Sequence, residues 1–150
     1  MSIHYDRIHS DDKNPTDFSR NDIADFLFEH LDEFGDAREA ILRSIAYAYG
    51  DGPDHCRDGF VLVAHKNEEI LGVVIINDTN MSGYIPEHIL VYIAVHAKAR
   101  GQGVGSKLME YTIAETKGDI ALHVEPDNPA RHLYEKAGFT NKYLEMRLKK

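Results

Sequence analysis

The chain has 150 residues, 43% of them hydrophobic and 28% charged, with a formal net charge of −8 at pH 7. This is the balance of a soluble globular protein, and the length predicts a single domain over residues 1–150. No apolar run approaches the roughly 20 residues that span a bilayer, and the polar residues 1–20 resemble neither a secretory nor a transit signal. The one cysteine, Cys56, cannot form an internal disulfide. We therefore expect a cytoplasmic protein with no membrane partner.

The charge is unevenly distributed along the chain. Residues 1–59 contain 6 Lys and Arg against 14 Asp and Glu, whereas residues 60–150 contain 11 of each kind. Because no basic run is present to neutralise phosphates, the sequence disfavours nucleic-acid binding. The acidic first part is either a solvated surface that aids solubility or a field that attracts a cationic substrate.

The first part of the chain predicts a strand followed by two helices. Residues 2–8 alternate weakly, as a short strand does. Ser19 and Asp22 have the spacing of a capping box, and the apolar residues that follow recur at helical intervals. A second amphipathic helix is predicted over residues 36–49, and the sequence at 50–53 (Gly-Asp-Gly-Pro) is typical of a helix end.

The second part predicts strands and helices in alternation. The β-branched runs at residues 60–65 and 70–76 are joined by a polar turn and favour a hairpin. Residues 89–95 form an apolar run without polar alternation, which is typical of a strand covered on both faces. The remaining predicted elements are helix 103–117, strand 120–124, helix 128–136 and strand 143–148. This order predicts a three-layer α/β domain, of the α+β kind, with a mixed sheet.

A glycine-rich turn follows the predicted strand 89–95 and opens the next helix: Arg100-Gly101-Gln102-Gly103-Val104-Gly105-Ser106. The N–H groups at a helix start lack an intrahelical acceptor, and glycines let a phosphate approach them closely. The turn is either a pyrophosphate cradle or an ordinary strand-to-helix connection. It has neither the G-x-G-x-x-G spacing of dinucleotide-binding folds nor the G-x-x-x-x-G-K-S/T spacing of P-loops.

The form Arg100-x-x-Gly103-x-Gly105 resembles the acetyl-CoA pyrophosphate loop of the GNAT superfamily of N-acetyltransferases. The stretch from Asn128 to Phe139 is similar to that superfamily's segment ending in L-Y-E-K-x-G-F. Together the two stretches place the resemblance in residues 88–148. It implies a three-layer fold whose fourth and fifth strands part, and a transfer of acetyl from acetyl-CoA directly to an amine.

The resemblance also implies roles for particular residues. Tyr134 matches the general acid near the sulfur, and Asn128 matches a position that contacts the pantetheine arm. An aromatic packed under the cleft and a helix cap are the respective alternatives. Backbone groups of the fourth strand would pair with pantetheine, and the Ile93 N–H would donate to the thioester carbonyl. The implied cofactor-binding residues are Ile93, Ala94, Val95, Arg100, Gly101, Gln102, Gly103, Val104, Gly105, Ser106, Asn128 and Tyr134.

Several residues compete for the role of general base. Some relatives carry Glu or His on the fourth strand, but the apolar Ile89 and Val91 fill those positions here. Other relatives carry a fifth-strand carboxylate at the position of His123, which makes this histidine the first candidate; an ordinary surface or core histidine is the alternative. The further candidates are Glu125, His88 and His96. No histidine cluster has cysteine partners at zinc spacing, so we expect no metal.

The leading hypothesis is an acetyl-CoA-dependent N-acetyltransferase that acts on a primary amine, which would be cationic if the acidic first part faces the acceptor. The alternative is a non-catalytic acyl-CoA-binding module with the same fold, and the presence of Tyr134 argues against it. A dinucleotide-dependent oxidoreductase lacks its glycine spacing and its position early in a βαβ chain. The acceptor and the oligomeric state are left open.

Overall fold

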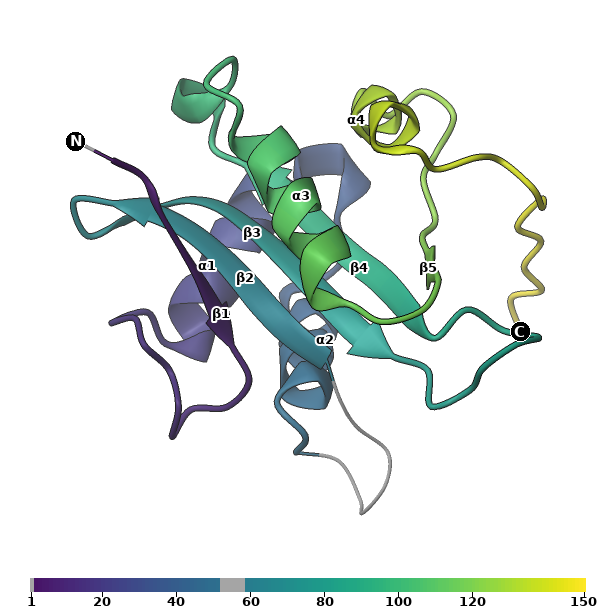
Figure 1. The fold of residues 1–150 in the computed structure, drawn as a ribbon, viewed down its shortest axis with the longest axis horizontal. Coiled ribbons are helices and arrows are strands. Elements are labelled where there is room, and N and C mark those ends of the chain that lie inside the picture. Colours follow the sequence, from purple (N-terminus) through teal and green to yellow (C-terminus); the bar gives the residue numbers. More distant parts are fainter. Residues whose placement is uncertain (1, 52–58) are drawn as a thin grey trace.

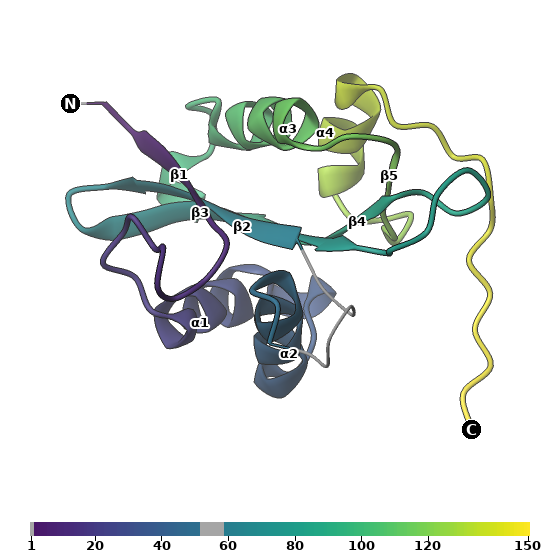
Figure 2. The same ribbon diagram turned by 60° about the horizontal axis from the view of Figure 1, so that its bottom comes forward.

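The computed structural model describes residues 2–51 and 59–150 as three layers, with a sheet between two pairs of helices (Figures 1 and 2). The five strands follow chain order across the sheet, and all neighbours are antiparallel except the parallel pair β4 and β5. This confirms the predicted mixed sheet. The elements are β1 (His4–Ile8), α1 (Arg20–His30), the 3₁₀ turn η1 (Asp32–Phe34), α2 (Arg38–Ala48), β2 (Gly59–Lys66), β3 (Glu69–Asp78), β4 (His88–Val95), the 3₁₀ turn η2 (Ala97–Ala99), α3 (Val104–Glu115), β5 (Ile120–Ala121) and α4 (Ala130–Ala137).

The start of α1 carries the predicted capping box. The Ser19 hydroxyl accepts from the Asp22 N–H at 3.1 Å, and the Asp22 carboxylate accepts from the Ser19 N–H at 2.8 Å. These bonds satisfy donors that a helix start leaves free. The helix that they fix buries Ile23 and Leu27 completely against the sheet.

The predicted hairpin is also confirmed. β2 and β3 pair antiparallel up to Lys66 and Glu69, and the two residues between them, Asn67 and Glu68, have φ angles of 53° and 62°. Positive φ at both central residues gives the two-residue turn whose twist fits that of the flanking strands.

Apolar side chains on the two faces of the sheet form two core clusters. One joins α1 and α2 to the sheet and includes Tyr92 and Ala94 of β4. The other joins α3 and α4 to the opposite face and includes Ile93 of β4 and Tyr134 of α4. Successive side chains of a strand point to opposite faces, so the end of β4 contacts both helix layers.

Two strand predictions are corrected at the C-terminal end. The predicted strand 120–124 pairs with β4 only at Ile120 and Ala121, because the two strands part beyond that point. The predicted strand 143–148 forms no pairing and is a tail without secondary structure (Figure 2). Its apolar side chains are 78–88% exposed. Its alternating pattern suits a strand, but a strand forms only where it meets a partner edge.

The predicted helix 36–49 is α2, and it is shorter at both ends than predicted. Gly50 follows it with a φ of 76°, in agreement with a helix stop. The remainder of the predicted stop, Gly52 and Pro53, lies outside the described residues, as does Cys56. Gly138 ends α4 with a φ of 110°. It is the predicted helix stop, although it leads into the tail and not into a strand.

Candidate functional site

The strands β4 and β5 part after two residue pairs. β5 pairs with β4 only at His88 and Ile89. Just beyond, the register between β3 and β4 shifts at Ile75–Ile76, which makes Val91 an extra residue in β4. Such a β-bulge bends its strand and increases the local twist. Beyond the bulge, the outer edge of β4 has no neighbouring strand in the part of the chain that the structure describes, which confirms the predicted parting.

Ile93, Ala94 and Val95 form the end of β4 beyond the bulge. They pair with β3 on their inner side. In an antiparallel pair, every second residue turns its N–H and C=O groups away from its neighbour. The open outer edge therefore offers backbone donors and acceptors to an extended ligand, as in strand addition. Their contact with pantetheine stays a prediction.

The glycine turn connects η2 to α3 beyond the end of β4 (Figure 1). Gly101 and Gly103 have φ angles of 82° and 78°, and a Cβ added to either would meet no atom within 4 Å. Gly103 is the N-cap of α3 and provides no side chain to cap it. The N–H groups of Val104, Gly105 and Ser106 therefore have no intrahelical acceptor. Free donors at the positive end of a helix dipole fit an anion such as a pyrophosphate.

Gly105 has a second role, which is close packing. A Cβ at this position would lie 3.3 Å from Leu133 Cδ2 of α4 and 3.7 Å from Val95 Cγ2 of β4. The absence of a side chain thus lets α3 approach both elements. Arg100 and Gln102 of the same turn are exposed, so their side chains are accessible to a ligand.

Tyr134 lies on α4 and is 7% exposed. It packs in the cluster that also contains Ile93 and Val104, and its ring centroid is 6.0 Å from that of Phe139. Within residues 2–51 and 59–150, no hydrogen bond engages its hydroxyl. Burial raises the pKa of Tyr134 to about 12. The hydroxyl therefore keeps its proton at neutral pH and is free to donate it to a ligand.

Asn128 lies directly before Pro129, the N-cap residue of α4, and its hydrogen bonds close the turn at the start of that helix. Its side-chain Oδ1 accepts from the Ala130 N–H at 2.9 Å, and its carbonyl accepts from the Arg131 N–H at 3.0 Å. This supports the capping interpretation. The side-chain NH₂ donates no hydrogen bond within the described chain, so the contact with pantetheine stays a prediction that is compatible with the cap.

His123 stands apart from the other site residues. It follows the paired part of β5 and is exposed. Its neighbours Leu122 and Val124 pack against the cluster that contains Tyr134. His123 itself does not belong to that cluster. The nearby Glu125 is also exposed. The assignment of His123 as base stays a prediction.

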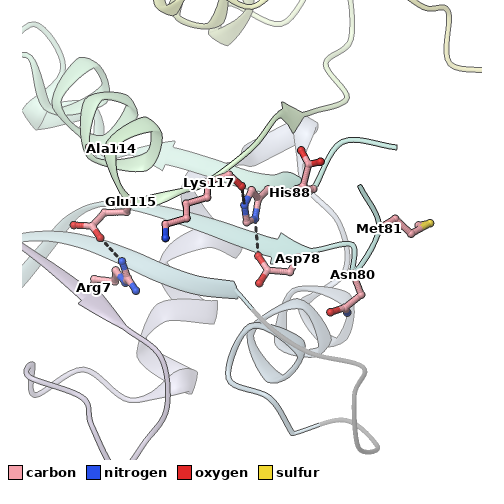
Figure 3. A pocket seen from close by; sticks show the side chains of 9 residues that line it. Arg7, Asp78, Asn80, Met81, His88, Ala114, Glu115 and Lys117 are labelled. Carbon is pink, nitrogen blue, oxygen red and sulfur yellow. Dashed lines mark hydrogen bonds and ion pairs between the residues drawn. The ribbon is translucent and has the colours of Figure 1, made fainter. Parts of the chain in front are cut away.

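His88 is fully engaged in structural hydrogen bonds (Figure 3). Its Nδ1 lies 2.6 Å from Asp78 Oδ1, and its Nε2 lies 2.7 Å from the carbonyl oxygen of Lys117. These bonds join the start of β4 to β3 and to the segment before β5. No ring nitrogen remains to take a proton from a substrate, so we exclude His88 as the base.

His88 lines a cavity of about 640 Å³ together with the Arg7–Glu115 ion pair and Lys117 (Figure 3). This cavity lies at the start of β4, whereas the glycine turn follows the end of the same strand. It is therefore separate from the predicted cofactor site.

His96 links the end of β4 to α1. Its Nδ1 accepts from the Lys98 N–H at 3.2 Å, and its ring centroid is 4.3 Å from that of His30. Burial, and then the neighbouring His96, lower the pKa of His30. The Nδ1 of His96 is thus engaged as the cap of η2, which makes it a poorer base candidate than the exposed His123.

One polar contact near the bulge was not predicted from the sequence. The Tyr92 hydroxyl donates to Asp36 Oδ2 at 2.6 Å. Burial and the bond to Asp36 raise the pKa of Tyr92. The contact holds an exposed carboxylate on the α1–α2 side of β4, one residue from Ile93. The sequence signal was Tyr92 itself, the one side chain with a polar group in the apolar run 89–95.

Within the described ranges, no three His, Cys, Asp or Glu side chains are grouped so that they could hold a metal ion. The expectation of a metal-free site stays a prediction. None of the helices found there is long and apolar enough to cross a membrane.

Residues 57–141 match the family model described as acetyltransferase (GNAT) domain. A curated relative, the 5-NmdU N-acetyltransferase of Pseudomonas phage PaMx11, is 36% identical over 84 residues, which are 55% of this chain. The match spans 58% of the length of that relative, less than two thirds. The chain therefore belongs to the GNAT acetyltransferase family, and it carries the domain of an acyltransferase family that uses acetyl-CoA.

Two solved structures illustrate the shared fold. The ribosomal-protein-alanine N-acetyltransferase from Brucella melitensis biovar Abortus 2308 is 16% identical with a TM-score of 0.65, and the alignment covers 99% of each chain. The aminoglycoside N-acetyltransferase AAC(6')-Iy in complex with CoA is 15% identical with a TM-score of 0.68, and the alignment covers 100% of this chain and 97% of that one. These likenesses confirm the predicted fold class.

Proposed function

We propose that this protein, as one domain over residues 1–150, transfers the acetyl group of acetyl-CoA directly to a primary amine. The observation that carries the proposal is the glycine turn with its free N–H groups, placed after the strand whose outer edge is open. An anion-binding turn and an open backbone edge fit the pyrophosphate and the pantetheine arm of one acetyl-CoA molecule. Ile93, Ala94 and Val95 would hold the arm, residues 100–106 the pyrophosphate, and Asn128 and Tyr134 the part near the sulfur.

The reaction moves protons as well as the acetyl group. The amine nitrogen bonds to the acetyl carbon, the C–S bond breaks, the amine loses a proton and the departing CoA thiolate gains one. A lysine-like ammonium has a pKa of about 10.4, so its deprotonation at pH 7 costs about 4.6 kcal/mol. A base near the acceptor lowers this cost, and His123 is our candidate. The Ile93 N–H would donate to the carbonyl oxygen as negative charge develops there.

Release of CoA thiol tests the proposal. The protein should release thiol from acetyl-CoA only in the presence of an amine, and mass spectrometry should detect the acetylated amine. The panel should include 5-NmdU, the acceptor in the name of the phage relative. Binding of acetyl-CoA without turnover of any amine would favour the non-catalytic binding module. Calorimetric binding of NADH in place of acetyl-CoA would favour an oxidoreductase.

The acceptor should be cationic, because a carboxylate is held on the α1–α2 side of β4. Asp36 is fixed by the Tyr92 hydroxyl, and residues 1–59 have a net charge of −8. We expect cationic amines to show a higher kcat/KM than neutral amines of similar size. Added salt should reduce the advantage, because salt screens exposed charges.

Asp36→Asn should remove most of this advantage. Asp12→Asn, which deletes the same charge from an exposed loop after β1, is the matched control and should retain it. Equal turnover of neutral and cationic amines at low salt would show that the acidic first part is only a solvated surface.

His123→Ala should lower kcat/KM and alter the acidic limb of its pH profile. An imidazole must be neutral to accept a proton, so activity that depends on it falls as the solution becomes acidic. The loss should shrink at high pH, where solvent deprotonates more of the amine. Full activity with an unchanged profile would eliminate His123, and Glu125 or an ordered water would become the better candidate.

A further inference from the structure

The segment between α3 and β5 is fastened to the start of β4 by two consecutive residues. The Glu87 carboxylate accepts from the Asp119 N–H at 2.6 Å, and the His88 N–H donates to the Asp119 carbonyl at 3.0 Å. The His88 ring makes a third contact, with its Nε2 at 2.7 Å from the carbonyl oxygen of Lys117. Gly118 packs so closely on Glu87 that an added Cβ would lie 2.4 Å from Oε1. These contacts hold the segment that leads directly into β5.

Few backbone bonds hold β5 on the sheet. It pairs with β4 only at His88–Ile120 and Ile89–Ala121, and the two strands part beyond that point. A strand with so little pairing opens at low cost, so its position depends on the contacts next to it. The bonds from Glu87 and His88 therefore determine where β5 leaves β4.

The His88 ring can make both of its hydrogen bonds only as an imidazolium. Its Nδ1 lies 2.6 Å from Asp78 Oδ1, and its Nε2 faces the Lys117 carbonyl oxygen. An ionised carboxylate and a carbonyl oxygen are both acceptors. A neutral imidazole has one N–H and one lone pair, whereas the charged ring has two N–H groups. The neutral ring would therefore set a lone pair against an oxygen at one of the two positions.

Loss of the proton should break the bond to Lys117. A hydrogen bond to a carboxylate is about twice as strong as one between neutral groups, so the remaining N–H should stay with Asp78. The Nε2 lone pair of His88 then faces the Lys117 carbonyl oxygen, and the two repel each other. The segment before β5 keeps its bonds to Glu87 and to the His88 backbone but loses the bond to the ring.

Charged and titratable side chains surround the His88 ring at the two adjoining cavities (Figure 3): Arg7 of β1, His9 after it, Asp78 of β3, Glu87 before β4, Glu115 of α3, and Lys117. Arg7 and Glu115 pair with each other. Glu87 accepts from the backbone N–H groups of Gly83 and Asp119. Asp78 is thus the carboxylate that pairs with the ring, and Lys117 carries a charge that opposes it. The His88 side chain is 14% exposed, so it can exchange its proton with solvent.

We propose that His88 is a positioning residue of the acetyl-transfer site, and that only its doubly protonated ring holds β5 in the described place. The catalytic consequence rests on the proposed function. The continuation of β5 carries His123, the candidate base, and Leu122 and Val124 beside it pack in the cluster of Tyr134. When the His88 ring loses its proton, this segment loosens and the candidate base is less well placed. Turnover should therefore fall as the solution becomes alkaline.

Two measurements without turnover test the role of His88. NMR of the ¹⁵N-labelled ring reports its protonation state, and hydrogen exchange reports the protection of the amides at residues 119–121. Between about pH 5 and pH 8, where histidine changes charge, this protection should fall as the ring loses its proton. After correction for the intrinsic effect of pH on exchange, the fall should be about tenfold or more. Amides in the β2–β3 pairing should keep their protection. A ring that stays in one protonation state over this range, or protection that does not follow the ring, would overturn the proposal.

Asp78→Asn separates a charged ring from an ordinary structural bond. The amide oxygen can still accept from Nδ1, but the negative charge that favours the imidazolium is gone. The pH at which the protection and kcat fall should therefore be lower by about one pH unit or more. Asp12→Asn removes an exposed carboxylate after β1 and should leave this pH unchanged. An unchanged pH in Asp78→Asn would show that the bond has no role beyond structure.

His88→Leu removes both side-chain bonds at every pH. It should lower kcat about tenfold or more and abolish the alkaline fall, because misplacement of a reacting group is costly. Affinity for acetyl-CoA should be unchanged, since the glycine turn follows the other end of β4. His132→Leu replaces a histidine whose side chain is 88% exposed and should retain the wild-type kcat. A normal kcat in a folded His88→Leu variant would contradict the positioning role. If no amine is acetylated at all, the proposed function fails, whereas NMR and hydrogen exchange still decide what His88 does.

Discussion

Tyr134→Phe should lower kcat about a hundredfold or more, which corresponds to about 2.7 kcal/mol, while acetyl-CoA binding stays close to that of the wild type. Phenylalanine keeps the ring that packs in the core near Phe139 and removes only the hydroxyl. That hydroxyl has no hydrogen-bond partner in residues 2–51 and 59–150, so its loss leaves no buried group unsatisfied. Steady-state kinetics and calorimetry with acetyl-CoA measure the two quantities.

The pKa of Tyr134 determines how the hydroxyl acts. Burial raises it to about 12, which is about 3.5 pKa units above an ordinary thiol. Complete proton transfer to the leaving thiolate would cost about 4.8 kcal/mol. We therefore expect the hydroxyl to act mainly by donating a hydrogen bond to the sulfur as charge develops. A group with a raised pKa stays protonated below that pKa, so Tyr134 should add no alkaline limb to kcat below about pH 11.

Tyr111→Phe removes a hydroxyl from a partly exposed tyrosine of α3 and is the matched control. It should leave kcat unchanged. Normal turnover by Tyr134→Phe would contradict the proposed role of Tyr134, although the family assignment would stand.

Local chemistry in the sequence was enough to predict most of the fold. The capping box at Ser19 and Asp22 needs only residues three apart, and both of its hydrogen bonds are present. The glycine turn was predicted in the same way, because positive φ angles at Gly101 and Gly103 are a local requirement. The parting of β4 and β5 was predicted from family resemblance alone. The bulge at Val91, where the two strands part, has no signature in a uniformly apolar run.

Features that depend on distant partners could not be predicted. The Tyr92–Asp36 hydrogen bond joins residues 56 positions apart, and nothing near either residue in the sequence indicates the other. The tail at 143–148 shows the opposite case. Its alternation predicts a strand, yet a strand forms only when it pairs, and in the described chain the tail pairs with no strand. Patterning specifies a face, whereas the partner is set by tertiary or quaternary structure.

Gly103→Val should weaken acetyl-CoA binding at least tenfold, or by about 1.4 kcal/mol. A Cβ at Gly103 would meet no protein atom within 4 Å, so the added side chain would occupy space above the free N–H groups of α3, where we place the pyrophosphate. The φ of 78° is also unfavourable for a β-branched residue, so some loss of stability is expected. Gly105→Val should weaken binding as well, but its contact with Leu133 would disturb the packing of α4.

Gly83→Val separates loss of binding from backbone strain. Gly83 lies in the β3–β4 connection with a φ of 81°, and a Cβ there would also meet no atom within 4 Å. The two valine variants should therefore lose similar amounts of thermal stability, because both force a β-branched residue into the left-handed region. Only Gly103→Val should lose acetyl-CoA affinity in calorimetry. If a folded Gly103→Val variant binds acetyl-CoA as tightly as Gly83→Val does, the pyrophosphate does not lie on this helix start, and the cofactor assignment of residues 100–106 is wrong.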